Sequence, residues 1–337
     1  MRVALVGLGT TGSHIARQLT QSPLSELTLF DDNQRRLHQV TSAVRSVSDK
    51  HQTITQGRSG SPAEVGADVV ILAGPVGSHR RLAADALSAG SHVVSLSDDA
   101  DEAVELLALD QLAHSVARSL VVGAGFSPGL SCLLTSFAAS QLDSVSVISV
   151  YRAGTGGPAC ARQNHRALKR SGQEWIDGAW VVRRGGSGRD LAWFPEPFGA
   201  RDCYKAALPT PLLLQPVFPG AQRISARIAA TRRDRFTSRL PMLRSPHDDG
   251  GPGAIRVEVK GQLDGAIETI ILGVMDHPSV AAGTLAALTA VAAAESRAPI
   301  GAHGLAAWPS ARQLLVDLRQ RGVRVATFGG RVEALAD

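Results

Sequence analysis

Residues 3–12, VALVGLGTTG, constrain the fold of this chain more than any other stretch. A short apolar run is followed by the pattern GxGxxG, formed by Gly7, Gly9 and Gly12, and then by residues 14–19, whose apolar positions are spaced as in a helix. Gly7 allows a tight turn, Gly9 lets the backbone approach a pyrophosphate, and Gly12 lets the helix pack closely on the strand. The stretch therefore predicts a strand, a turn and a helix that together bind a dinucleotide.

A second strand is expected at residues 27–30, and it ends at Asp31. An acidic side chain at this place binds a ribose 2′-hydroxyl, which favours NAD, whereas Arg35 and Arg36 in the next turn could neutralise the 2′-phosphate of NADP. The alternative is a glycine-rich turn that binds no nucleotide. From this part of the chain, the residues expected to bind NAD or NADP are Gly7, Gly9, Thr10, Thr11, Gly12, Asp31, Asp32 and Arg35.

Strands and helices alternate through residue 130, which predicts a doubly wound parallel sheet. The apolar strand 68–73 leads into the loop 74–79, at the carboxyl end of a strand, where open α/β sheets bind ligands. A later strand runs into the stretch 123–130, GAGFSPGL, in which Pro128 suits the first turn of a helix. These loops add further expected cofactor contacts, namely Gly74, Pro75, His79, Phe126 and Pro128.

Beyond Tyr151 the pattern becomes that of an α+β domain. Asp177-Gly178 and Asp264-Gly265 each separate two strand-like runs, which predicts two hairpins with type I′ turns and a mostly antiparallel sheet. Clustered Arg, Pro, Asp and Gly predict a mobile loop or lid at 231–253, and the alanine-rich helix 279–296 is expected to return to the first domain, leaving a cleft between the domains. The expected fold class is α/β. A Rossmann domain is expected at 1–130, an α+β substrate domain at 131–275, and C-terminal helices that return to the Rossmann domain at 276–337.

The quoted motifs resemble those of the saccharopine dehydrogenase-like family of NAD(P)-dependent oxidoreductases. The initial GxGxxG, the strand-end aspartate, the loop AGPVGSH and above all GAGFSPGLS carry this resemblance strongly over residues 1–135. It extends loosely through IRVEVKGQLDGAIETIILGVMDHP and LLVDLRQRGVRV. Many relatives have Pro-Glu where this chain has GLAAW at 304–308, so saccharopine itself is not implied as substrate. The resemblance implies an enzyme that transfers hydride to or from a C–N or C–O bond of a small acidic, amino-acid-like substrate.

Positive charge is concentrated in residues 150–245, which hold 17 Lys and Arg against six Asp and Glu, a net charge of +11. Aromatic residues are only 4% of the chain and no nucleic-acid-binding module is recognised, so a nucleic-acid partner is not expected. A small acidic substrate or a solvated arginine-rich surface accounts better for the charge.

A helix is predicted at 158–170, because a glycine turn is followed by proline. Arg162, His165, Arg166 and Lys169 then share one face, which either lies against an anion or is simply solvated. The helix N-terminus offers free N–H groups to a substrate carboxylate. The substrate-binding candidates are Arg152, Thr155, Gly156, Arg162 and Arg166.

The first candidate for the catalytic proton donor is His165, whose ordinary pKa is near neutrality. Lys169 is the second, since neighbouring cations lower the pKa of a lysine. Asp98 and Asp99 are a third choice, with an N-cap role as their alternative. Cys160 is either a nucleophile or, more often in such a place, a small buried side chain.

The three cysteines are widely spaced, which suggests neither disulfides nor a metal site and fits a cytoplasmic protein. No signal-peptide pattern is present, and the uncharged stretch 277–294 is expected to be a buried helix, so no membrane contact is expected. A homodimer is compatible with the sequence. A protein that binds the nicotinamide cofactor as a sensor without turnover, its basic domain contacting a partner, is the alternative to an enzyme.

Overall fold

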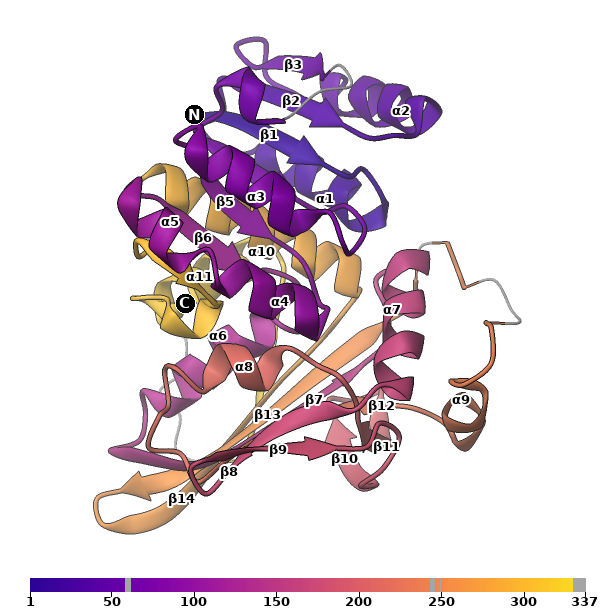
Figure 1. The fold of residues 1–337 in the computed structure, drawn as a ribbon, viewed down its shortest axis with the longest axis vertical. Helices are drawn as coiled ribbons and strands as arrows, with labels where there is room; N and C mark the ends of the chain where they lie inside the picture. Colours follow the sequence, from indigo (N-terminus) through magenta and orange to yellow (C-terminus); the bar gives the residue numbers. More distant parts are fainter. Residues whose placement is uncertain (58–61, 243–245, 249, 330–337) are drawn as a thin grey trace.

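The computed structural model describes residues 1–57, 62–242, 246–248 and 250–329. The first half of the chain alternates strands and helices as predicted (Figure 1). Its elements are β1 (Arg2–Val6), α1 (Thr10–Leu19), β2 (Glu26–Phe30), α2 (Gln34–Arg45), β3 (Thr53–Gln56), the 3₁₀ helix η1 (Pro62–Val65), β4 (Val69–Leu72), α3 (His79–Ser88), β5 (His92–Ser95), α4 (Ala100–Leu107), α5 (Asp110–Ser115), β6 (Ser119–Val122) and α6 (Leu130–Ala139).

The first sheet is a seven-stranded parallel sheet in the order β15-β6-β5-β4-β1-β2-β3. The chain leaves β1 in one direction through β2 and β3 and returns to its other side through β4, β5 and β6. The prediction of a doubly wound parallel sheet is therefore confirmed. All four residues of β4 are buried, as expected for a strand that is covered on both faces. The switch between β1 and β4 opens a crevice at the carboxyl ends of the strands.

The second sheet is mixed and mostly antiparallel, in the order β10-β11-β12-β7-β13-β14-β16, and the hairpin β8–β9 is attached to β12. Only the β12–β7 pair is parallel among its described pairings. The elements here are β7 (Ser144–Ala153), α7 (Pro158–Lys169), β8 (Gly172–Ile176), β9 (Ala179–Arg183), β10 (Asp190–Phe194), β11 (Gly199–Lys205), α8 (Thr210–Leu214), β12 (Arg223–Ala229), α9 (Arg232–Thr237), β13 (Gly253–Leu263) and β14 (Ala266–Asp276).

Both predicted hairpins form, β8–β9 and β13–β14. Their turn residues have positive φ, 48° and 84° at Asp177 and Gly178 and 52° and 76° at Asp264 and Gly265, as a type I′ turn requires.

Two local predictions differ from the structure. Helix α6 begins at Leu130, so Pro128 lies in the preceding loop and not in the first helical turn. The segment 231–253 contains the helix α9, because Thr231 and Asp234 form a reciprocal capping box at its start. Residues 243–245 and 249 of this segment lie outside the described residues, and its mobility stays a prediction.

The C-terminal part returns to both sheets. It comprises α10 (Pro278–Ala294), β15 (Gly301–His303), the 3₁₀ helix η2 (Leu305–Ala307), α11 (Ala311–Gln320) and β16 (Val325–Gly329). Helix α10 packs against α1 so closely that a Cβ on Gly283 would lie 2.7 Å from the Cβ of His14. Strand β15 extends the first sheet and β16 extends the second. The division of the chain at residues 130 and 275 stays a prediction.

No helix in the described ranges is long and apolar enough to cross a membrane. Helix α10 is uncharged, but 14 of its 17 residues are buried in the protein.

Gly12→Val is expected to lower the free energy of unfolding by about 3 kcal/mol, because overpacking cannot be relieved where the neighbour is backbone. A Cβ at Gly12 would lie 1.9 Å from the carbonyl oxygen of Gly7. Denaturant titration measures this loss. Gly9→Ala is the matched control, since a Cβ at Gly9 meets nothing within 4 Å and its φ of −61° suits alanine. Equal stability of Gly12→Val and Gly9→Ala would contradict this account of the turn.

Candidate active site

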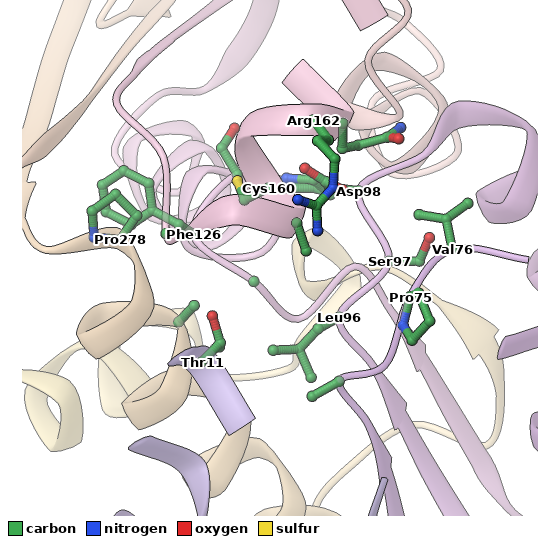
Figure 2. A pocket seen from close by; sticks show the side chains of 18 of the residues that line it. Thr11, Pro75, Val76, Leu96, Ser97, Asp98, Phe126, Cys160, Arg162 and Pro278 are labelled. Carbon is green, nitrogen blue, oxygen red and sulfur yellow. The ribbon is translucent and has the colours of Figure 1, made fainter. Parts of the chain in front are cut away.

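A cavity of about 220 Å³ lies where the carboxyl ends of β4, β5 and β6 face α7. Figure 2 shows Asp98, Cys160 and Arg162 gathered in one region of it, with Thr11 from the glycine loop on another side. The residues that line it from the first half of the chain are Thr11, Ala73, Gly74, Pro75, Val76, Leu96, Ser97, Asp98, Gly125, Phe126, Ser127 and Pro128. Those from later segments are Arg152, Gly154, Gly156, Ala159, Cys160, Arg162, Gln163, Arg166, Pro278 and Ala282.

The glycine loop borders this cavity and has an open face toward solvent. Gly7 has a φ of 90°, and a Cβ there would lie 2.5 Å from the backbone nitrogen of Gly74. Gly9, by contrast, has open space where its Cβ would be. Gly9 also N-caps α1 without a side-chain hydrogen bond, so the first-turn N–H groups have no side-chain cap. An uncapped helix N-terminus beside open space fits a pyrophosphate.

Asp31 connects the end of β2 to the glycine loop. Its Oδ2 accepts a hydrogen bond from the N–H of Leu8 at 2.7 Å, and its Oδ1 accepts one from the N–H of Asn33 at 2.8 Å. The guanidinium of Arg36 lies 3.6 Å from Oδ2. Ionised carboxylate oxygens have about four lone-pair sites, so acceptor capacity remains for a ribose hydroxyl. Asp32 and Arg35 are exposed next to this point, as a contact with the adenosine end would require.

His79 is buried under the loop that was expected to place it against the cofactor. Its Nε2 lies 3.0 Å from the carbonyl oxygen of Gly74, and its Nδ1 lies 2.8 Å from the hydroxyl of Ser95. Burial lowers the pKa of His79, which favours the neutral ring. Since a carbonyl only accepts, we assign the proton to Nε2 and the acceptor role to Nδ1. The ring does not line the cavity, so it holds the Gly74 loop in place and does not face a ligand there.

Glu102, which sequence reasoning missed, fixes the same loop. Its Oε1 accepts hydrogen bonds from the N–H groups of Gly77 and His79 at 2.8 and 3.0 Å, and its Oε2 accepts one from the hydroxyl of Ser97 at 2.6 Å. The side chain is buried, and its partners lie on the loops after β4 and β5 and at the start of α3. An acidic residue in the first turn of a helix is common, because it complements the helix dipole, so the sequence carried no signal of this role.

Asp98 and Asp99 follow β5 and point to different places. Asp99 accepts hydrogen bonds from the N–H groups of Asp101 and Glu102 and caps α4, the alternative role weighed from the sequence. Burial raises the pKa of Asp99, but hydrogen bonds from the Glu102 N–H and Gln163 outweigh it and leave the pKa below its usual value. Asp98 lines the cavity instead.

Arg152 is buried and carries the charge opposite Asp98. Its Nη1 lies 3.4 Å from Oδ2 of Asp98 and also donates to the carbonyl of Ser127, and its Nη2 donates to Oδ1 of Asn164 at 2.6 Å. Burial raises the pKa of Asp98, and Arg152 opposes that shift without cancelling it. Asp98 therefore keeps its proton to a higher pH than an ordinary aspartate does. With these partners Arg152 holds the loops together, while its buried Nε has no hydrogen-bond partner among the described residues.

Helix α7 brings only part of its cationic stripe to the cavity. Arg162 and Arg166 line the cavity, and both are exposed to solvent within it. His165 does not line it, because its side chain points about 100° away from that of the adjacent Arg166 around the helix. Its Nε2 lies 2.9 Å from the carbonyl oxygen of Leu240, beside a separate hollow. Lys169, at the far end of the helix, faces a third hollow.

Other candidates divide between the cavity and its surroundings. Gly156 lines it, whereas Thr155 lines the hollow beside His165. Burial raises the pKa of the Cys160 thiol to about 11, which keeps it protonated and argues against a nucleophile. Gln163, not anticipated from the sequence, donates to Asp99, and its buried Oε1 has no hydrogen-bond partner among the described residues. That orphaned acceptor sits in the wall of the cavity.

The fold combines a Rossmann-like parallel sheet, with the glycine loop beside it, and a second, mostly antiparallel sheet. No family model matches the sequence. Among solved structures, apo saccharopine dehydrogenase (L-Glu forming) from Saccharomyces cerevisiae matches with a TM-score of 0.73 at 13% identity, over 97% of this chain and 99% of that one. C. glutamicum DAP dehydrogenase in complex with DAP matches with a TM-score of 0.50 at 14% identity, over 96% and 99%. The chain thus has the fold of the saccharopine dehydrogenase-like family.

Proposed function

We propose that this protein is an NAD(P)-dependent oxidoreductase that acts on a C–N or C–O bond of a small acidic, amino-acid-like substrate. The observation that carries the proposal is the adjacency of two sites. The open face at Gly9 suits a dinucleotide, and the neighbouring cavity contains a carboxyl group, Asp98, and two exposed guanidinium groups, Arg162 and Arg166. A bound nicotinamide supplies or accepts the hydride in such enzymes.

Each group in the cavity then has a distinct task. Arg162 and Arg166 bind the substrate carboxylate, which guanidinium groups do with paired hydrogen bonds. Asp98 gives a proton to the nitrogen or oxygen of the bond as it is reduced, and takes that proton back in the opposite direction. Glu102 and His79 hold the loops that position these groups. For the cofactor, the strand-end carboxylate of Asp31 supports NAD over NADP.

The proposal is tested by mixing the protein with NADH or NADPH and a panel of 2-oxo acids, each with and without ammonia or an amine. Loss of the fluorescence of the reduced nicotinamide in the presence of one acid is the expected result. Tight cofactor binding without consumption by any acid in the panel would instead favour the sensor.

Arg166→Ala is expected to weaken substrate binding by about 1.5–3 kcal/mol, because one charge-assisted hydrogen-bonding partner of the carboxylate is lost. Cofactor affinity should not change. Steady-state kinetics at saturating cofactor measure the effect as a higher KM. Lys169→Ala removes a charge from the same helix outside the cavity and is the matched control. Equal KM values for the two variants would remove Arg166 from the substrate site.

A further inference from the structure

The hollow that Lys169 faces, of about 280 Å³, lies at the far end of α7, between that helix, the loop after β9 and α9. It shares no lining residue with the first cavity. Among the described residues, four cationic side chains and no carboxylate line it: Lys169, Arg184, Arg235 and Arg239. Its volume approaches that of pockets that take small ligands.

These cations lack acidic partners. In the part of the chain that the structure describes, no carboxylate oxygen lies within 4.0 Å of any of the four. Three acids of these segments have other partners: Glu174 pairs with Lys205 at 2.7 Å, Asp202 pairs with Arg189 at 2.9 Å, and Asp234 accepts hydrogen bonds from Thr231. The hollow therefore concentrates positive charge that no described carboxylate pairs with, and this charge would attract a multivalent anion.

One of the four cations is already held in place. The Nε of Arg235 donates to the carbonyl oxygen of Gly186 at 2.8 Å, and its guanidinium lies 4.3 Å from the centre of the Tyr204 ring. Its terminal nitrogens donate to no acceptor in the described ranges, so a preoriented donor fork remains for a ligand.

The loop after β9, which contains Gly185 and Gly186, packs against the end of α7. A Cβ at Gly185 would lie 2.3 Å from the carbonyl oxygen of Arg170, so only glycine lets this loop approach the helix. Gly186 has a φ of 71°. The hydroxyl-bearing Ser187 and the side chain of Phe236, which is 80% exposed, complete the wall. The lining of the hollow thus combines a glycine turn, a hydroxyl group and an exposed aromatic ring.

We propose that this hollow binds a small phosphorylated ligand, as a second site that is separate from the cofactor and substrate sites. Guanidinium forks match the oxygens of a phosphate group, and several cations without carboxylates suit a group that carries more than one negative charge. Phe236 covers the apolar part of the ligand. The inference does not depend on the proposed oxidoreductase activity, because it concerns only the binding of a ligand in this hollow.

The test is calorimetric titration of the full chain with pyrophosphate. The double variant Arg184→Ala/Arg239→Ala removes two exposed cations that have no described partner, so its fold should be retained. We expect its dissociation constant to rise at least about tenfold, which corresponds to about 1.4 kcal/mol. Arg201→Ala/Arg223→Ala removes the same charge from exposed positions on β11 and β12 and should keep the wild-type affinity.

The variant Gly9→Asp distinguishes binding in this hollow from binding at the GxGxxG loop. Pyrophosphate bound at the GxGxxG loop would be lost in this variant, whereas pyrophosphate bound in the hollow would not. Wild-type affinity in Arg184→Ala/Arg239→Ala, or an equal loss in the control pair, would overturn the proposal. Absence of any pyrophosphate binding would do the same and would mean that the four cations form only a solvated surface. None of these outcomes depends on turnover, so the oxidoreductase proposal is judged separately.

Discussion

Asp98→Asn is expected to lower kcat for reduction by about 10²–10⁴, the usual contribution of a positioned proton donor. The substitution keeps the size of the side chain but removes the transferable proton. Arg152 retains its hydrogen bonds to Ser127 and Asn164, so the cavity should keep its shape. Cofactor affinity and substrate KM should change little, because the lost interaction is made in the transition state.

The rate of reduction should depend on pH through the protonation of Asp98. Burial raises the pKa of Asp98, and the donor is active when protonated. The rate of reduction should therefore be highest below that pKa and fall as the pH rises through it. This fall should be absent in Asp98→Asn. Kinetics over a range of pH measure both effects.

His165→Ala is the control, because the His165 ring lies outside the cavity and should leave kcat unchanged. A large loss in His165→Ala with a normal Asp98→Asn would restore the histidine predicted from the sequence. It would also require α7 to turn in the bound state.

Gly9→Asp is expected to weaken NAD(H) binding at least about 100-fold, or about 2.7 kcal/mol, while the protein stays folded. A carboxylate would stand where the backbone must approach the pyrophosphate, and like charges would repel. Gly9 is the N-cap of α1 and its φ is −61°, so aspartate fits there and caps the helix favourably. Stability should thus stay equal or rise while binding is lost.

Fluorescence titration with NADH measures this affinity. Gly220→Asp adds the same charge at a glycine whose Cβ also meets nothing within 4 Å, far along the chain, and should bind normally. Gly9→Asn distinguishes repulsion from occlusion, since it is uncharged and similar in size. Wild-type affinity in Gly9→Asp would mean that the glycine loop holds no dinucleotide.

Local patterns predicted the elements of the candidate site better than they predicted its side chains. Period and turn chemistry placed the start of α7 at Pro158 and the turn at Asp264-Gly265, because both depend on residues within a few positions. The direction of His165 depends on how α7 is rotated against the first domain. No feature of residues 158–170 specifies that rotation.

The hydrogen bonds between buried polar groups could not be predicted from the sequence either. His79 and Glu102 are 23 residues apart in sequence, and the hydrogen bond from the His79 N–H to Glu102 forms only when β4 and β5 are neighbours. The sequence does not distinguish Gln163 from an ordinary helix residue, and only the structure shows its hydrogen bond to Asp99. Such contacts are fixed by the packing of distant segments.

Local sequence patterns were enough to predict the doubly wound sheet, the glycine turn beside α1 and the two type I′ hairpins. These follow from hydrophobic period and from backbone angles that glycine or aspartate adopt readily. Long-range packing, by contrast, turns Asp98 toward the cavity while Asp99 caps α4, and it orients α7 so that Arg162 and Arg166 line the cavity and His165 does not. The direction of a side chain between two packed segments depends on the relative placement of whole elements, which no local pattern encodes.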